Sequence, residues 1–141
     1  MFLQDNELDL STYLKLRCKV GWKPLTEEQA KRAIENSLYT VVVYDNNEPI
    51  GMGRIVGDGA VICYIQDLIV IPQYQKQGVG HMIMESLIDY IKKIKIPGTD
   101  MMLDLMCAKG RESFYERYGF IARPTQQLGP GMILYINGET K

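Results

Sequence analysis

The chain has 141 residues, of which 46% are hydrophobic and 23% are charged. This length suits one domain with a real core, and this composition excludes an intrinsically disordered chain. With 16 basic and 17 acidic residues the net charge is −1, so the basic surplus of a general nucleic-acid binder is absent. We expect a single domain over residues 1–141 that binds no nucleic acid.

Nothing in the sequence predicts a targeting or membrane segment. The first ten residues include acids and lack the apolar core of a signal peptide. The nearly apolar stretch of residues 61–72 is interrupted by Gln66 and Asp67 and is too short to span a bilayer. Three cysteines cannot all pair in one chain, and none has a neighbour at CxxC spacing. We therefore expect reduced and mostly buried thiols, no metal, no membrane contact and a cytoplasmic location.

The first third of the chain is predicted to be helical. Leu10, Leu14 and Val20 recur at a roughly helical spacing, which predicts a helix over residues 11–20. Thr26 followed by Gln29 has the pattern of a capping box, in which the hydroxyl and the amide side chain each satisfy a backbone amide. A second helix is therefore expected over about residues 27–36.

The rest of the chain alternates strands and helices. Three β-branched and apolar runs predict an antiparallel meander at residues 39–44, 50–56 and 60–71. An apolar stripe predicts a helix at residues 79–94, and the chain then predicts a strand at 101–106, a short helix at 110–118, and strands at 120–123 and 132–136. The order ααβββαβαββ indicates an α/β (α+β) domain, with a mixed sheet of about six to seven strands and about four flanking helices.

The loop at residues 75–80 carries the strongest functional signal. Its two glycines, Gly78 and Gly80, allow positive φ and a close backbone approach, and the helix that follows offers free amides and a positive dipole end. Together these features predict a site for a phosphate or pyrophosphate. The Walker A pattern fails because His81 and Met82 follow Gly80, and the dinucleotide fingerprint fails at Ile83. A tight turn without a ligand is the alternative.

Two segments resemble the GNAT superfamily of N-acyltransferases. The segment IQDLIVIPQYQKQGVG at residues 65–80 is similar to motif A, a strand with an apolar-Pro end followed by a Gln/Arg-x-x-Gly-x-Gly/Ala loop and a helix. The segment SFYERYGF at residues 113–120 is similar to motif B, which typically reads FYEKxGF. The resemblance covers about residues 39–123, and it implies that the chain uses acetyl-CoA.

The resemblance assigns acetyl-CoA two sets of contacts. The pyrophosphate would be held by the loop and the start of its helix, that is by Gln75, Lys76, Gln77, Gly78, Val79 and Gly80. The pantetheine arm would pair, like an added strand, with the exposed backbone edge of Leu68, Ile69 and Val70. The strands at residues 65–71 and 101–106 would separate to form the slot for this arm.

The family reaction is direct attack of an amine on the thioester carbonyl. Tyr115 matches the motif position whose hydroxyl approaches the CoA sulfur in many members. Because a thiol has a pKa of about 8.5 and a tyrosine one of about 10, we expect Tyr115 mainly to hydrogen-bond the developing thiolate, with proton transfer late. A core tyrosine is the alternative. The backbone amide of Leu68 or Ile69 would hold the thioester oxygen.

The general base is not evident from the sequence. Family members that use a side-chain base on the motif A strand place it at the positions of Tyr64 or Gln66, and neither residue is a base. Asp67 is the nearest carboxylate, but strand alternation turns it away unless a bulge intervenes. A buried Asp67 bonded to backbone or to Arg54 is the alternative. Deprotonation through ordered water is the expected route.

The resemblance implies an N-acetyltransferase that acts on a primary amine of a small molecule or peptide. A CoA-binding sensor or regulatory module without turnover is the alternative, and a phosphate-loop protein of another fold is a third. Residues 22–24 lie in a region that often lines the acceptor pocket, although packing is the alternative for Trp22. A homodimer is left open, because many members dimerise through late strands and residues 132–136 are apolar enough to need cover.

Overall fold

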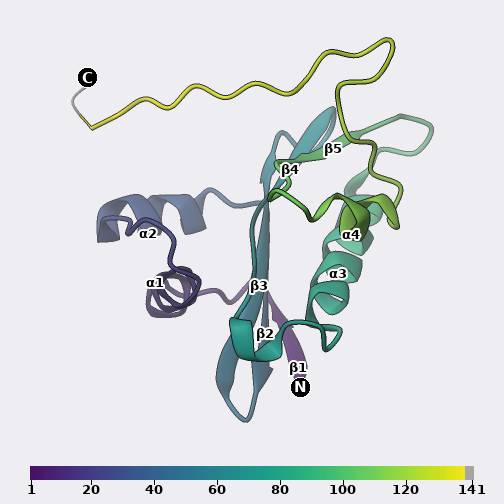
Figure 1. The fold of residues 1–141 in the computed structure, drawn as a ribbon. Helices are drawn as coiled ribbons and strands as arrows, with labels where there is room; N and C mark the ends of the chain where they lie inside the picture. The colour runs from purple at the N-terminus through teal and green to yellow at the C-terminus, as the bar shows by residue number, and fades with distance from the viewer. Residues whose placement is uncertain (139–141) are drawn as a thin grey trace. The chain divides into compact units, whose positions relative to one another are not determined.

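The computed structural model describes residues 1–138. The chain divides into two compact units, Met1–Met106 and Cys107–Lys141, and each is described by itself. The first unit contains one mixed five-stranded sheet with helices on both faces (Figure 1). No helix among residues 1–138 has the length and apolar character needed to cross a membrane.

The sheet has the strand order β1-β2-β3-β4-β5. Its first four strands pair antiparallel in sequence order, and β5 lies parallel to β4. The bounds are Phe2–Asp5 for β1, Tyr39–Asp45 for β2, Glu48–Gly57 for β3, Ile62–Val70 for β4 and Met102–Leu105 for β5. A helix joins β4 to β5, so these three elements form the parallel βαβ unit that the sequence predicts.

Three α-helices cover the sheet of the first unit. On one face lie α1 (Leu10–Lys19), capped by Asp9, and α2 (Glu27–Glu35), capped by Thr26 (Figure 1). On the other lies α3 (Val79–Ile94), preceded by the short 3-10 turn η1 (Pro72–Tyr74). The predicted bounds of α3 are confirmed, and α1 and α2 agree with the prediction to within one residue at each end. The apolar stripe of α3 and the capping box of α2 therefore predict these helices correctly.

Two glycines of β3 bring α3 close to the sheet. A Cβ added to Gly53 would lie 2.8 Å from Ile83 Cγ2 of α3. One added to Gly51 would lie 3.1 Å from side-chain atoms of Val79 and Ile83 of α3 and 2.8 Å from the Ile69 carbonyl oxygen of β4. Real Cβ atoms are essentially never found so close to another heavy atom. The core between α3 and the sheet therefore depends on the absence of side chains at these two positions.

The second unit contains α4 (Glu112–Glu116) and a cluster of aromatic rings. Tyr115 makes edge-on ring contacts with Phe114, at 5.1 Å between centroids, and with Phe120, at 6.0 Å. The predicted helix at residues 110–118 is thus present in shortened form. Residues 120–123 and 132–136 belong to no strand.

The expectation of six to seven strands was wrong, since the described residues contain five. The two late segments have strand-like composition, but a strand also requires a hydrogen-bonded partner, and no pairing includes them in residues 1–138. In the other direction, β1 was missed, because a four-residue edge strand is too short to show a clear alternation. The expectation of mostly buried thiols was also wrong, because Cys18 and Cys107 are exposed and only Cys63 is buried.

Candidate functional site

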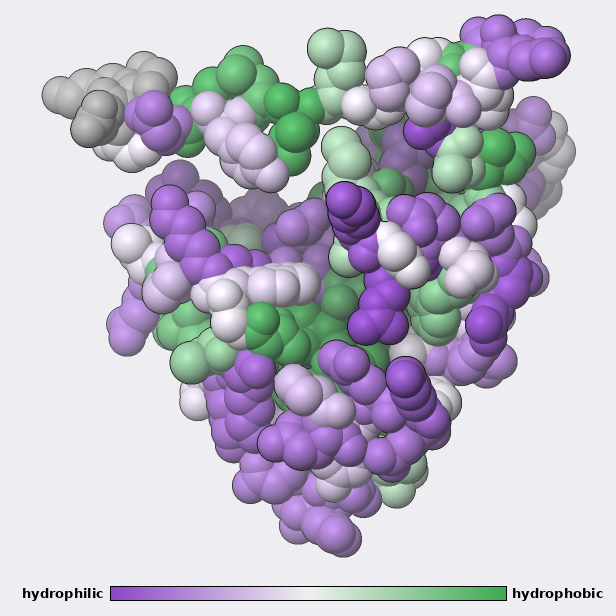
Figure 2. Space-filling model, viewed as in Figure 1, coloured by the Kyte–Doolittle hydropathy of each residue, from purple (hydrophilic) through white to green (hydrophobic). Residues whose placement is uncertain are grey.

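The strands β4 and β5 part near the middle of β4. Their pairing runs from Ile62 opposite Met102 to Ile65 opposite Leu105, and β4 continues alone to Val70. Within residues 1–138, the second half of β4 thus pairs only with β3 and keeps one edge open. Figure 2 shows hydrophobic surface in the middle of the first unit, between the helices of its two faces, with hydrophilic residues around it.

A β-bulge separates the two halves of β4. Arg54 of β3 lies opposite Gln66, whereas Met52 lies opposite Ile69, so β4 contains one residue more than β3 over this interval. Asp67 adopts the left-handed conformation, with φ of 57°. Because Met52 and Arg54 point to the same face of β3, Gln66 and Ile69 also share a face, and the side-chain alternation of β4 reverses at the bulge.

The bulge turns the Asp67 carboxylate into a buried ion-pair network. Its Oδ1 accepts a hydrogen bond from Arg17 Nη1 at 2.9 Å, and its Oδ2 accepts one from Arg54 Nε at 2.8 Å. The Tyr13 hydroxyl also donates to Oδ2. The side chain of Asp67 has 0% exposure, and those of Arg17 and Arg54 have 13% and 11%. One carboxylate therefore joins α1, β3 and β4.

The same network raises the pKa of Tyr13. Burial is the main cause, and the hydrogen bond to Asp67 and the negative charge of Asp67 add to it. The charges of Arg54 and Arg17 act in the opposite direction. The Tyr13 hydroxyl thus stays protonated and remains a donor to the carboxylate.

The backbone of the second half of β4 presents its polar groups alternately to β3 and to the open edge. The Ile71 amide donates to the Ile50 carbonyl at 2.9 Å, so Ile71 and, two residues earlier, Ile69 face β3. Leu68 and Val70 therefore face the open edge. The Gln75 side chain donates to the Val70 carbonyl at 3.1 Å, which leaves the groups of Leu68 and the Val70 amide at that edge.

The glycine loop leads from this edge into α3. Lys76 has φ of 64° and Gly78 has φ of 87°, so the chain turns sharply twice before the helix begins at Val79. The first intrahelical bond runs from the Met82 amide to the Gly78 carbonyl at 3.1 Å. The amides of the first helical turn precede that bond, and no side chain among residues 1–138 caps this end. Uncapped amides at a helix N-terminus favour an anion.

In the second unit, Tyr115 carries the largest pKa shift for which a value is resolved. Burial, with a contribution from Cys107, raises its pKa to about 12, and Arg111 opposes the shift. The hydroxyl is therefore fully protonated at neutral pH. It is also a weaker acid than an ordinary tyrosine, so it is suited to donating a hydrogen bond rather than to releasing its proton.

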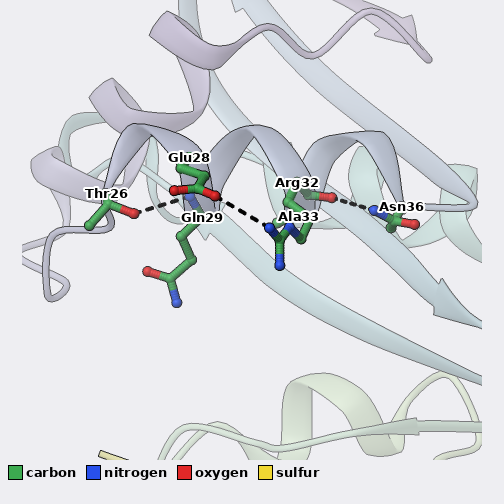
Figure 3. A pocket seen from close by; sticks show the side chains of 6 residues that line it. All are labelled: Thr26, Glu28, Gln29, Arg32, Ala33 and Asn36. Carbon is green, nitrogen blue, oxygen red and sulfur yellow. Dashed lines mark hydrogen bonds and ion pairs between the residues drawn. The ribbon is translucent and has the colours of Figure 1, made fainter. Parts of the chain in front are cut away.

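A shallow hollow on α2 lies outside this arrangement (Figure 3). Its polar groups bond one another, because the Thr26 hydroxyl accepts from the Gln29 amide and Arg32 pairs with Glu28. It is lined by Thr26, Glu28, Gln29, Arg32, Ala33 and Asn36. These contacts belong to the cap and the solvated face of a helix, and they point to no ligand.

The structure brings the predicted cofactor residues of the first unit into one continuous path, from Leu68 through the loop to Gly80. Tyr13 and Arg17 were not identified from the sequence as partners of Asp67. The feature that could have indicated them is their spacing of four residues, which places them on the same face of α1. The stripe chosen for α1 was Leu10, Leu14 and Val20, whereas the residues buried on α1 are Tyr13 and Leu16. An arginine one position after Leu16 thus lies beside the buried face, where it needs a counter-charge.

Comparison with known proteins gives consistent matches. Residues 11–134 match the family model described as an acetyltransferase (GNAT) domain. An uncharacterized N-acetyltransferase, ycf52-like, from Prochlorococcus marinus is 30% identical over 128 residues, which are 88% of this chain and 69% of that protein. The ycf52 N-acetyltransferase of Gracilaria tenuistipitata is 31% identical over 114 residues, 78% of this chain, and the match spans 60% of its own length. A crystal structure from meticillin-resistant Staphylococcus aureus, a probable acetyltransferase of unknown function, has a TM-score of 0.80 and 32% identity, and the match covers 96% of this chain and 100% of that one.

Proposed function

Because this chain belongs to the GNAT acetyltransferase family, whose general reaction is acetyl transfer from acetyl-CoA, we propose that it is an N-acetyltransferase acting on a primary amine of a small molecule or peptide. The observation that carries the proposal is the open edge of β4, which ends directly at the glycine loop and the uncapped start of α3. A long ligand with a polar arm and a pyrophosphate fits that succession of groups.

The pyrophosphate is assigned to the amides of residues 77–80, with Gln75 and Lys76 beside them. Gly78 supports this assignment, because its left-handed backbone aims the following amides and no atom of residues 1–138 lies within 4 Å of a Cβ added there. The pantetheine arm is assigned to the β4 edge, where Leu68 and the Val70 amide offer backbone groups.

The thioester oxygen is assigned to the backbone at Leu68. The resemblance allows the amide of either Leu68 or Ile69 in this role. Ile69 faces β3, where its carbonyl lies against Gly51, so its amide points away from the arm. The Leu68 amide faces the open edge and can stabilise charge on that oxygen.

Proton removal from the amine is assigned to ordered water. An alkylammonium has a pKa of about 10.4, so forming the free amine at pH 7 costs about 4–5 kcal/mol. Asp67 lies on the acceptor side by virtue of the bulge, but the side chains of four residues, Tyr13, Arg17, Arg54 and Gln66, donate to its carboxylate, and none of its side chain is exposed. Its contacts support a structural role, so we place no base at this position.

The leaving thiolate is assigned to the Tyr115 hydroxyl. Its position in the FYERYGF segment and its pKa of about 12 support this role, since the group is a protonated donor throughout the physiological range. Because the hydroxyl is a weaker acid than a thiol, we propose that it hydrogen-bonds the developing thiolate and does not need to transfer its proton.

Calorimetric binding of acetyl-CoA to the wild type and to Gly80→Asp tests the proposal. Gly80 is the second residue of α3 and has no positive φ, so aspartate is compatible with its backbone. The new carboxylate would stand at the proposed pyrophosphate site, and like charge should weaken binding by at least about tenfold, or 1.4 kcal/mol. Gly129→Asp is the matched control, because a Cβ at Gly129 meets no atom of residues 1–138 within 4 Å.

Micromolar binding to the wild type and to Gly129→Asp, with loss in a folded Gly80→Asp, is the expected result, with folding checked by circular dichroism. Absence of binding to the wild type would overturn the proposal. Binding without acetyl transfer to any member of a panel of primary amines and peptides would favour a CoA-binding module instead.

A further inference from the structure

One side chain ties the connection between α1 and α2 to the β4 bulge. Arg17 donates from Nη1 to Asp67 and from Nη2 to the Lys23 carbonyl, at 2.9 and 3.1 Å. Its guanidinium lies over two aromatic rings, 5.8 Å from the centroid of Tyr13 and 5.3 Å from that of Trp22. The planar group thus uses both terminal nitrogens as donors and contacts two rings, which the single ammonium of a lysine does not match.

The connection has no other such anchor. Within the described residues, every hydrogen bond and aromatic contact of residues 22–25 is made with Arg17, namely the Trp22 amide to the Arg17 carbonyl, the Arg17 side chain to the Lys23 carbonyl, and the stacking on Trp22. Arg17 is therefore the polar and aromatic anchor of this segment, and Asp67 holds the other end of the same guanidinium.

Asp67 immediately precedes the open edge of β4. Leu68, the next residue, presents its backbone groups at that edge, and the pairing of β4 with β5 ends two residues before Asp67. A ligand that hydrogen-bonds Leu68 acts on the backbone of the bulge. Asp67 is bonded directly to Leu68 in the chain, and Arg17 links its carboxylate to the Lys23 carbonyl by hydrogen bonds and to the Trp22 ring by its guanidinium.

We propose that Arg17 is a positioning residue that couples a cofactor bound along the β4 edge to the α1–α2 connection. The proposal rests on the proposed function for the identity of the cofactor, acetyl-CoA. The coupling means that residues 22–25 have different contacts when the cofactor is bound and when it is absent. Such a difference is what any linkage between two sites requires. In this way the pantetheine arm bound along β4 fixes the position of residues 22–25 before the amine binds.

Trp22 reports directly on this coupling. It is the only tryptophan of the chain, it is 39% exposed, and indole emission responds to solvent and to a neighbouring charge. Excitation at the red edge of indole absorption avoids both tyrosine and the adenine of the cofactor. We expect acetyl-CoA to cause a saturable change in Trp22 emission with the same dissociation constant as calorimetry. ADP, which carries a pyrophosphate but no pantetheine arm, should cause none.

Arg17→Lys separates positioning from folding. The variant keeps a cation beside Asp67 but loses the second arm to the Lys23 carbonyl and the flat stacking on Trp22. We expect its affinity for acetyl-CoA to stay within about threefold of the wild type, since the ligand contacts are untouched, while the change in Trp22 emission is lost. Arg32→Lys is the matched control, the same substitution at a 75% exposed ion pair of α2, and it should keep both signals.

The outcomes are distinguishable. If the wild type does not bind acetyl-CoA, the proposed function fails. If it binds without a Trp22 response, if Arg17→Lys retains the response, or if ADP gives an equal one, the coupling alone is overturned. Should Arg17→Lys not fold, hydrogen exchange of the wild type decides: acetyl-CoA should slow exchange of the amides of Gly21, Trp22, Lys23 and Leu25, and unchanged exchange would overturn the coupling.

Discussion

Asp67 illustrates how two cations make a buried carboxylate structural. Asp67→Asn would keep the shape of the side chain but leave Arg17 and Arg54, both nearly buried, without a counter-charge. Removing one partner of a buried ion pair costs about 3–5 kcal/mol of unfolding free energy. Urea unfolding of Asp67→Asn should show a loss of this size.

Glu48→Gln is the control for this measurement. It removes the exposed ion pair of Glu48 with Lys15, at 2.9 Å, and should leave the urea midpoint unchanged because solvent screens such pairs. If Asp67→Asn were as stable as this control but lost acetyl transfer, the structural interpretation would fail and Asp67 would return as a candidate base.

Tyr115 allows a test of the leaving-group contact. Tyr115→Phe removes the hydroxyl but keeps the ring contacts with Phe114 and Phe120, so we expect kcat to fall by about 100-fold with unchanged acetyl-CoA affinity. Tyr118→Phe, three residues on, should retain most of its activity. Steady-state kinetics on any amine accepted in the panel provides the measurement, and an equal loss in both variants would contradict the assignment.

The raised pKa of Tyr115 also predicts the alkaline limb of the pH profile. Burial favours the neutral hydroxyl, so the folded protein keeps this proton as the pH passes the ordinary tyrosine value of 10 and releases it only near 12. The wild-type rate should therefore show no fall from this group below about pH 10. If the wild-type rate fell near pH 9 and this fall were absent in Tyr115→Phe, the pKa of Tyr115 would not be raised in the active protein.

At the scale of single residues, the sequence predicts the chemistry of a side chain better than it predicts which side chains contact it. The alternative to a catalytic Asp67, a buried carboxylate bonded to backbone or to Arg54, includes a bond that the structure confirms. Tyr13 and Arg17 were not assigned, because they lie 54 and 50 positions away and only the packing of α1 on the sheet brings them to the carboxylate. Contacts between positions so far apart produce no regular spacing in the sequence from which they could be predicted.

At the scale of elements, the fit of α3 on β3 leaves no room for a side chain at Gly53. Gly53→Ala would place a methyl group 2.8 Å from Ile83 and 3.1 Å from Leu87. Such overpacking costs about 1–3 kcal/mol. Thermal unfolding should show this loss, whereas Gly129→Ala, which meets no atom within 4 Å in residues 1–138, should be near neutral. A stable Gly53→Ala would mean that α3 can withdraw from the sheet without penalty.

The elements also show where periodicity succeeds and fails as a guide. The stripe of apolar residues fixes α3 because its packed face repeats over sixteen residues. Alternation fails in β4 because one residue at the bulge inverts it, and aspartate carries no obligatory mark of a bulge, unlike a glycine or proline. The predicted strand at residues 60–71 therefore agrees with β4 to within two residues at each end, but the predicted alternation of side chains fails after Gln66.

For the molecule as a whole, the exposed apolar residues of the second unit predict self-association. Residues 132–136 are all exposed, from 61% for Ile133 to 88% for Met132. Surface apolar runs of this kind usually require cover. Light scattering should show a mass that rises with concentration, and Leu134→Lys should reduce it. A monomer at all concentrations would remove the homodimer from consideration.

The bulge at Asp67 has a consequence for how β4 can evolve or be engineered. Side chains of a strand alternate between its two faces with a period of two residues. The extra residue of the bulge shifts this alternation between the first half of β4, which pairs with β5, and the second half, which has an open edge. Deleting Asp67 would remove the extra residue and place Leu68 opposite Gly53, with Ile69 still opposite Met52, so the later residues of β4 would keep their faces while Arg17 and Arg54 would lose their carboxylate partner. A one-residue insertion or deletion at another position of β4 would leave the bulge in place and swap the faces of the residues beyond it, whereas a substitution is a local change.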